Sequence, residues 1–261
     1  MPFKPNFKTL PRSQRKAWPH LAPAKDLGFC LYGGTALALR FGHRESVDFD
    51  FFSAAALDKA SLMEKLPFLS GAVVLQESAN SYVFMATPPG EKTPVKLSFF
   101  AEISYGRIGS PDLSADGVLL AASVRDLMAT KLKVLFNRVE PKDYIDIAAM
   151  IAGGVSLADG ARDAMALYPQ FNPMECFKAL GYFDSKELAG LDDNCKLVLK
   201  RAVKSVSTTI QSFSPSSLAS SSLVLSPKET AFELSRARSP GRASASTIKR
   251  KSRSMPPENG R

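Results

Sequence analysis

The chain has 261 residues, 45% of them hydrophobic, which suffices for one large or two small globular domains and excludes a chain that is disordered throughout. No apolar run approaches the roughly 20 residues needed to span a bilayer, and the first residues lack the apolar segment of a signal peptide, so we expect a cytoplasmic protein without membrane association. The formal net charge of +9 favours a polyanionic partner such as nucleic acid.

Much of this positive charge lies at the two ends of the chain, which leaves its role open. Residues 1–20 form a basic arm that is expected to pack lightly and to lead into a short helix at 14–21. Residues 206–261 are rich in Ser, Arg, Lys and Pro, and we predict a disordered tail because they cannot bury enough apolar surface to offset chain entropy. Each end is either a nucleic-acid-binding segment or a solvated charge run.

The most informative stretch is LYGGTALALRFGHRESVDFDFF, residues 31–52. An apolar strand ends at a double glycine, Gly33 and Gly34, whose missing Cβ atoms allow close approaches that other residues block. Thr35 is expected to cap a helix that ends at Gly42. The pattern therefore predicts a strand, a glycine turn and a helix in direct succession.

The next strand, VDFDFF, alternates strictly between polar and apolar residues. Alternation places Asp48 and Asp50 on one face and the apolar side chains on the other. Two carboxylates one pleat repeat apart, about 7 Å, repel each other. The sequence therefore predicts a cation between them.

Further elements predict an α/β (α+β) core at residues 21–117, with a mixed β-sheet flanked by helices. Ser53 is expected to cap a helix at 57–66, and strands are expected at 72–76, 81–86 and 95–100. After a Gly-, Pro- and Asp-rich loop, the composition becomes helical, and residues 118–205 are predicted to form a helical C-terminal lobe. Its helices are expected at 121–138, 144–151, 157–167, 173–180 and 186–203.

The glycine turn and the paired acids together fit a nucleotide. Backbone N–H groups of Gly33, Gly34 and Thr35, at a helix N-terminus, can bind phosphate oxygens. Asp48 and Asp50 can hold one or two Mg²⁺ ions that bridge the phosphates and stabilise the leaving pyrophosphate. Each half is common by itself, because many double glycines form ordinary tight turns and many paired acids lie on solvated strand edges. The order and spacing of the two halves are specific.

The helical lobe supplies a second cluster of candidate site residues. Lys131 and Arg138 fall within the apolar stripe of their helix, where they either snorkel to solvent or face a polar cleft. The KDYID segment that follows favours the cleft, with Lys131 on nucleotide phosphates. Asp143 and Asp146 share a helix face, and either could orient Lys131, complete the metal site or accept a proton.

The blocks GGTALALRFGHRESVDFDFF and ATKLKVLFNR with KDYIDI resemble the AbiEii/AbiGii group of nucleotidyltransferase-like toxins, in the DNA polymerase β-like superfamily. The resemblance covers roughly residues 10–203. It implies a minimal nucleotidyltransferase fold with a helical C-terminal lobe, and transfer of a nucleotide from an NTP with Mg²⁺ (or Mn²⁺). It also implies a bacterial toxin–antitoxin or abortive phage-infection system, a cognate antitoxin partner and, in some members, the 3′ end of tRNA as acceptor.

By motif, the family's site residues fall on positions already singled out: the glycine motif on Gly33, Gly34 and Thr35, the metal pair on Asp48 and Asp50, the lysine on Lys131, and the later acid on Asp146. Arg44 is a further candidate contact for phosphate or base, as is Arg138 for the nucleotide. His43, in a helix-to-strand loop, is expected at the surface.

The chain departs from the superfamily at Ser98, where the superfamily's polymerases usually carry a third carboxylate on a neighbouring strand. Serine is no carboxylate base at neutral pH. Either Asp143 or Asp146 takes that role, or catalysis is weak. The first hypothesis is therefore a nucleotidyltransferase that acts on RNA, and the second a weakly catalytic nucleotide- or RNA-binding protein acting through an antitoxin. A protein or small alcohol as acceptor would use the same site.

Overall fold

The computed structural model describes residues 2–210, with side chains as far as residue 206. Its centre is a mixed sheet whose seven strands in this part of the chain run in the order β3-β4-β5-β2-β1-β7-β6. β2 lies at the centre, parallel to β5 and antiparallel to β1. The strands are β1 (Cys30–Tyr32), β2 (Asp48–Phe52), β3 (Val73–Glu77), β4 (Ser81–Ala86), β5 (Val95–Phe100), β6 (Asp112–Leu113) and β7 (Leu120–Ala121).

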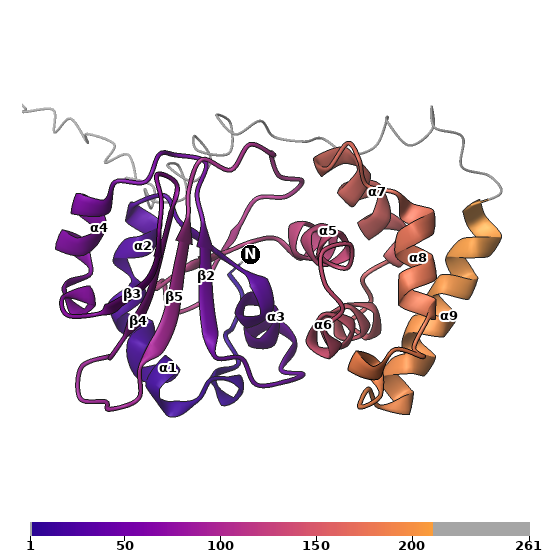
Figure 1. Cartoon of the computed structure of the whole chain (residues 1–261), viewed down its shortest axis with the longest axis horizontal. Helices are drawn as coiled ribbons and strands as arrows, with labels where there is room; N and C mark the ends of the chain where they lie inside the picture. The colour runs from indigo at the N-terminus through magenta and orange to yellow at the C-terminus, as the bar shows by residue number, and fades with distance from the viewer. Residues whose placement is uncertain (1, 211–261) are drawn as a thin grey trace, which may run out of the picture.

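Helices flank this sheet and continue away from it as a helical lobe, as predicted (Figure 1). On one side of the central strands lie α1 (Arg12–Ala17), α2 (Pro23–Asp26) and α4 (Lys59–Lys65), and on the other lies α3 (Gly33–Phe41). α3 contacts α5 (Val124–Val134) and α6 (Pro141–Ala152). The outer helices are α7 (Leu157–Leu167), α8 (Pro173–Gly181) and α9 (Asp193–Ile210), and short 3₁₀ helices occur at Phe7–Thr9, Trp18–Leu21, Pro67–Leu69 and Lys186–Leu188.

The predicted alternation of β2 is confirmed, and its apolar face anchors the strand. Phe49 and Phe51 are fully buried, and the ring of Phe51 stacks on that of Phe99 in β5 with 5.0 Å between centroids. Since successive side chains of a strand point to opposite faces, a one-residue slip would expose these rings. The aromatic core therefore fixes Asp48 and Asp50 on the opposite face, toward the helical lobe.

The N-terminal arm packs firmly, so the prediction of light packing is wrong. Trp18 is buried, and its ring lies 6.4 Å from that of Phe49. The amide of Ser46 donates to the carbonyl of Thr9, and Nε2 of Gln14 donates to the carbonyl of Val47 at 2.8 Å. The apolar residues between the basic ones are buried, and the arm holds the chain in place just before β2.

Two predicted helix caps are also wrong. No side chain caps α3, because the hydroxyl of Thr35 donates instead to the carbonyl of Asp48. Asp58, rather than Ser53, caps α4 by accepting from the amide of Ser61. The C-terminal end of α3 is as predicted, since Gly42 takes a left-handed conformation with φ of +66°.

The first lobe helix is shorter than expected. Residues 120–121 form β7, Ser123 caps α5, and the helix ends at Val134, so Arg138 lies beyond it. The last helix, by contrast, runs past residue 205 to Ile210. The rest of the predicted tail, residues 211–261, lies outside the described part of the chain. Within residues 2–210, no helix combines the length and the apolar character needed to cross a membrane.

Candidate functional site

A cleft of about 250 Å³ lies between β2 and the α5–α6 pair, where the sheet meets the helical lobe. Residues from several separate stretches of sequence line it, and most of them are polar or charged. They are Gly34, Thr35, Arg44, Glu45, Ser46, Val47, Asp48, Asp50, Lys96, Lys131, Arg138 and Lys142.

The sheet wall of the cleft carries the two acids of β2. Asp48 and Asp50 are half-buried on the same face of the strand. Burial raises the pKa of Asp50, a hydrogen bond from Ser98 lowers it, and the negative charge of Asp48 raises it further. Ionised Asp50 is therefore under-compensated by the protein, which is the condition expected of a carboxylate that receives a cation.

The glycine turn lies directly beside these acids. Gly33 has a φ of +70°, and a Cβ there would lie 2.8 Å from Oδ2 of Asp50. A Cβ on Gly34 would lie 2.3 Å from Nη2 of Arg44. Both glycines are therefore required for the close approach of a charged side chain, and the uncapped N-terminal N–H groups of α3 begin at the same place.

Lys131 forms the centre of the opposite wall. This lysine lines the cleft although it is only 7% exposed. Its Nζ lies 2.7 Å from Oδ1 of Asp143 and 2.7 Å from Oδ2 of Asp146. Both aspartates are fully buried on α6. The two carboxylates hold the ammonium group between α5 and α6, so the lysine is fixed in place rather than snorkelling freely.

Asp146 is hydrogen-bonded on both of its oxygens by three different side chains. Oδ1 accepts from His43 Nε2 at 2.6 Å and from Arg44 Nε at 2.7 Å, while Oδ2 accepts from Arg44 Nη2 at 2.8 Å and pairs with Lys131. Burial would raise the pKa of Asp146, but the hydrogen bonds from His43 and Arg44 and the charge of Lys131 lower it well below its usual value. Such a carboxylate is a poor proton acceptor.

Asp143 is similarly occupied, because it accepts from Lys131 and, at 2.9 Å, from Nε of Arg138. Of the three roles considered for Asp143 and Asp146, the geometry supports the orientation of Lys131. It does not support the metal-ligand or proton-acceptor roles, since both side chains are engaged in ion pairs and no group of three potential metal ligands forms among residues 2–210.

A second, smaller cavity of about 170 Å³ opens from the cleft on the Gly33 side. It shares Gly34, Asp50, Lys131 and Arg138 with the cleft. Its remaining walls are largely apolar or aromatic: Tyr32, Phe52, Leu127, Thr130 and Val134. The two cavities thus join a charged compartment to an apolar one.

β5 supplies two residues next to the acids of β2. In the parallel pairing, Lys96 lies opposite Asp48 and Ser98 lies opposite Asp50. Ser98 therefore occupies the expected position beside the paired acids, and it is 1% exposed. Lys96 lines the cleft, and its positive charge lowers the pKa of Asp50.

The structure brings together all the residues expected from the sequence, but some in different roles. Arg44 and Arg138 contact the aspartates of α6, and both still line the cleft. His43, expected at the surface, is largely buried against Asp146. Lys96 and Ser46 were missed as site residues. Only for Lys96 did the sequence hold a signal, its alternation with Ser98.

The cleft offers a metal ion few protein ligands. Among residues 2–210, no three or more His, Cys, Asp or Glu side chains gather into a metal site. Asp48 and Asp50 nevertheless fit Mg²⁺, which is commonly bound by one or two carboxylates together with substrate phosphates and water. The residues present therefore fit an ion that arrives with a nucleotide.

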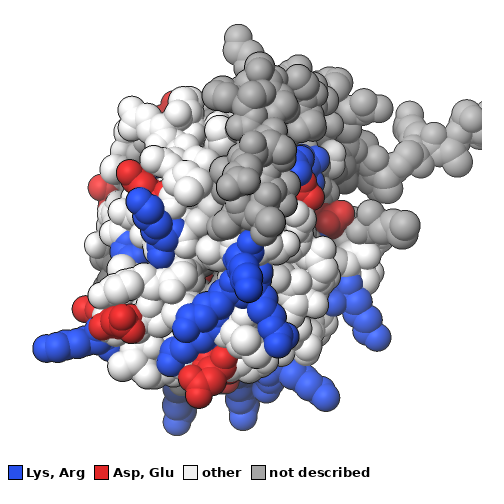
Figure 2. All heavy atoms as spheres, turned by 90° about the vertical axis from the view of Figure 1, so that its right-hand side faces the viewer, with Lys and Arg blue, Asp and Glu red and all other residues white. Residues whose placement is uncertain are grey.

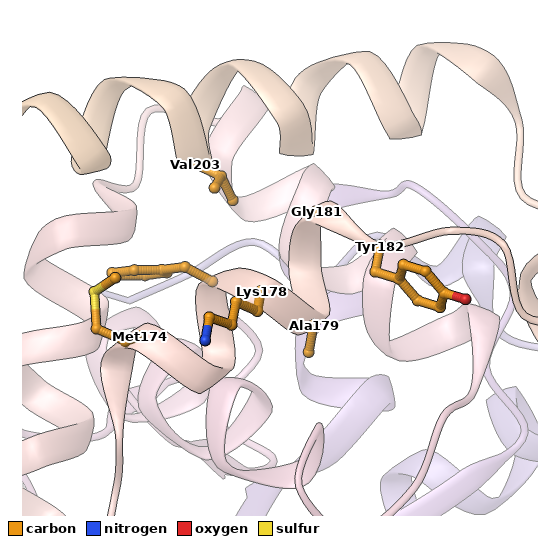
Figure 3. A pocket seen from close by; sticks show the side chains of 7 residues that line it. Met174, Lys178, Ala179, Gly181, Tyr182 and Val203 are labelled. Carbon is orange, nitrogen blue, oxygen red and sulfur yellow. The ribbon is translucent and has the colours of Figure 1, made fainter.

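A larger hollow of about 690 Å³ lies between α8 and α9 (Figure 3), but its chemistry is different. Its lining in the described part of the chain has a single charged side chain, Lys178, among mostly apolar groups that include Met174, Phe177 and Val203. It contains no acid that could hold a cation against a phosphate. The chemistry therefore points to the cleft at β2.

The chain has relatives among known protein families and solved structures. A family model described as nucleotidyl transferase AbiEii toxin, type IV TA system, matches residues 20–193, the range that contains the whole cleft. An uncharacterized protein of Aquifex aeolicus (strain VF5) is 32% identical over 147 residues, which make up 54% of this chain and 66% of that protein, just under two thirds of its length.

Two solved structures share the fold at low sequence identity. A protein of H. pylori that is designated a nucleotidyltransferase has a TM-score of 0.52 and 15% identity, over 77% of this chain and 95% of that one. MenT4, a nucleotidyltransferase toxin of Mycobacterium tuberculosis H37Rv, has a TM-score of 0.50 and 13% identity, over 85% of this chain and 91% of that one. These likenesses show a nucleotidyltransferase-like fold.

Proposed function

Because the chain belongs to the AbiEii family of nucleotidyl transferase toxins, we propose that it transfers an NMP from an NTP to a hydroxyl group of RNA, with the 3′ end of tRNA as the preferred acceptor. The reaction joins the acceptor oxygen to the α-phosphorus and releases pyrophosphate. We place the protein in a toxin–antitoxin system that counters phage infection, with a cognate antitoxin as its partner.

One observation carries this proposal. Asp50, whose charge is under-compensated, and its neighbour Asp48 lie on β2 and face a lysine whose position is fixed by two buried aspartates. A triphosphate with its divalent cation complements both walls, because the cation matches Asp48 and Asp50 and the phosphate oxygens match Lys131. Neither wall alone selects a nucleotide.

The chain's own residues position the NTP. Phosphate oxygens lie against the N–H groups of Gly34 and Thr35, with Lys131 and Arg138 opposite them. The nucleoside extends into the apolar cavity beside Tyr32. Asp48 and Asp50 would hold Mg²⁺, or Mn²⁺, and this ion would supply positive charge that stabilises the phosphates in the transition state.

No side chain of the cleft is assigned as a dedicated base. Asp143 and Asp146 are committed to ion pairs, and Ser98 does not deprotonate a hydroxyl at neutral pH. Nucleotide transfer depends mainly on positioning and on stabilising charge. The proposal therefore assigns the proton of the acceptor hydroxyl to solvent and to no particular side chain.

The proposal is tested by incubating the protein with each labelled NTP and total RNA, and separating the products on a gel. We expect label on RNA from one or a few NTPs, lost in Asp48→Ala and retained in Asp159→Asn, which changes an exposed acid on α7.

The second candidate, a binding protein without efficient catalysis, is motivated by the serine at position 98. It predicts nucleotide binding without release of pyrophosphate. Steady pyrophosphate release in the presence of RNA would exclude this candidate, whereas nucleotide binding with no release under any condition would exclude the transferase.

A further inference from the structure

A groove of about 590 Å³ continues the cleft beyond Asp48, between α1 and the β4–β5 hairpin. It shares Val47, Asp48 and Lys96 with the cleft, so the two spaces meet at the first acid of β2. Its outer walls include Arg12 from α1 and Glu91 from the hairpin.

We infer that this groove holds the 3′-terminal nucleotides of the RNA acceptor, and that Arg12 binds a backbone phosphate there in competition with Glu91. The inference rests on the proposed function and adds the site and the charged residues that select a polynucleotide. The 3′-hydroxyl then reaches the α-phosphorus past Asp48.

The position of the groove matches the direction from which the acceptor must come. In nucleotide transfer, the attacking and leaving oxygens lie roughly in line on opposite sides of the phosphorus. The leaving phosphates are assigned to the Gly34 and Lys131 side of the cleft. The acceptor therefore approaches from the other side of Asp48, where the groove opens.

The size of the groove separates it from the other neighbouring cavity. Small-molecule sites typically measure roughly 300–1,000 Å³. The groove, at about 590 Å³, falls within this range, whereas the cavity beside Tyr32, at about 170 Å³, does not. The groove is therefore the larger of the two spaces that adjoin the cleft, and the acceptor is assigned to it.

The lining of the groove is balanced in charge, with Arg12 and Lys96 against Asp48 and Glu91, but the chain beside it is strongly basic. The first 25 residues include no Asp or Glu, and α1, with the sequence RSQRKA, contributes Arg12, Arg15 and Lys16. A basic surface alone would not locate the acceptor, because Figure 2 shows Lys and Arg side chains on the face of the helical lobe as well. The charge at α1 differs in being next to Asp48.

In the ion pair between Arg12 and Glu91, the carboxylate can be exchanged for an RNA phosphate. Arg12 Nε lies 2.9 Å from Oε1 of Glu91, but the arginine side chain is 74% exposed and the glutamate 9%. Because the guanidinium is exposed, a phosphate can reach it, and the largely buried carboxylate of Glu91 competes with that phosphate for Arg12. Arg12 is already held at the groove when RNA arrives.

The test measures steady-state KM for bulk tRNA and for the NTP in the full-length chain. Arg12→Ala is expected to raise KM for tRNA by about fivefold and to reduce the slope of log KM against log salt by about 0.7, the value for one lost phosphate contact on a single strand. Glu91→Gln is expected to lower KM for tRNA. Arg201→Ala, an exposed arginine on α9, is the matched control and should change neither value.

Opposite changes in the two variants distinguish the inference from a loss of folding, since damage would impair both. If KM for tRNA were the same in wild type, Arg12→Ala and Glu91→Gln, the assignment of the groove would be wrong. A rise in KM for the NTP that equals the rise for tRNA would overturn it too. If the wild type labelled no RNA at all, the failure would lie in the proposed function instead.

Discussion

The two walls of the cleft hold their acids in opposite ways. On the sheet wall, Asp48 and Asp50 are half-buried neighbours of like charge, and the pKa of Asp50 is raised by its burial. On the helical wall, Asp143 and Asp146 are fully buried, and cationic side chains surround them. Asp50 lacks compensation that a ligand can provide, whereas the helical acids are already compensated by the protein.

This difference separates Asp48 and Asp50, which are assigned to bind a ligand, from Asp143 and Asp146, which position Lys131. A carboxylate accepts further partners only where its oxygens are free, and breaking a buried pair leaves an uncompensated charge. Replacing a sheet acid should therefore affect chemistry and spare the fold. Replacing a helical acid should destabilise the fold, and should change nucleotide transfer only by displacing Lys131.

The largest effect is expected for Asp48→Asn. This change keeps the size of the side chain but removes a charge that the cation requires, so nucleotide transfer should fall on the order of 10³-fold or more. The free energy of unfolding should remain within about 0.5 kcal/mol of wild type. Label transfer and urea unfolding measured on the same preparation check both parts, and a stable variant with undiminished transfer would remove Asp48 from the site.

Asp146→Asn should have the largest effect on stability. The change leaves Lys131, Arg44 and His43 facing a neutral amide in a buried site, which typically costs about 3–5 kcal/mol. Urea unfolding measures the loss. Asp159→Asn, which removes an exposed pair with Arg162, should cost less than about 1 kcal/mol, and equal losses in the two variants would contradict the assigned roles.

The stability that Asp146 provides should depend on pH in one direction. Its pKa is lowered in the folded state, so the contribution is complete above the unfolded value of about 3.9 and is lost as the pH falls below it. The difference in unfolding free energy between wild type and Asp146→Asn should be constant from pH 7 to 5 and shrink below pH 4. A difference that shrinks between pH 7 and 5 would point to another group.

Ser98→Ala should produce the smallest effect. The change removes one hydrogen bond to Asp50 and no charge, so transfer should stay within about tenfold of wild type. Label transfer at saturating NTP measures it. A loss as large as that of Asp48→Asn would mean that the serine takes part directly in the reaction.

The sequence predicted the elements of the sheet wall well because local rules govern them. Alternation in β2 placed Asp48 and Asp50 on one face, and Gly42 marked the end of α3, as the structure confirms. The fold class and the helical lobe followed from similar patterns. The caps of α3 and α4 were wrong because Thr35 and Ser53 have other hydrogen-bond partners in the folded chain.

The contacts of the helical wall could not be predicted, because they join distant parts of the sequence. His43 reaches Asp146 across 103 positions, and this contact requires the packing of α3 on α6. Lys96 enters the cleft only because β5 pairs with β2 in one register, which single-strand alternation does not specify. The buried arm was missed for the same reason.

The most direct test of the difference between the two walls is thermal unfolding of Asp50→Asn and Asp146→Asn side by side at pH 7, without nucleotide. Asp50→Asn should raise the Tm by roughly 2–4 °C, because it removes a charge that burial and Asp48 disfavour, and Asp146→Asn should lower it by more. Adding NTP with Mg²⁺ should raise the Tm of wild type, and should raise that of Asp50→Asn by clearly less because one of the two metal-binding carboxylates is missing. If both variants shifted the Tm in the same direction, or if the nucleotide stabilised Asp50→Asn as much as wild type, the division between binding acids and positioning acids would be wrong.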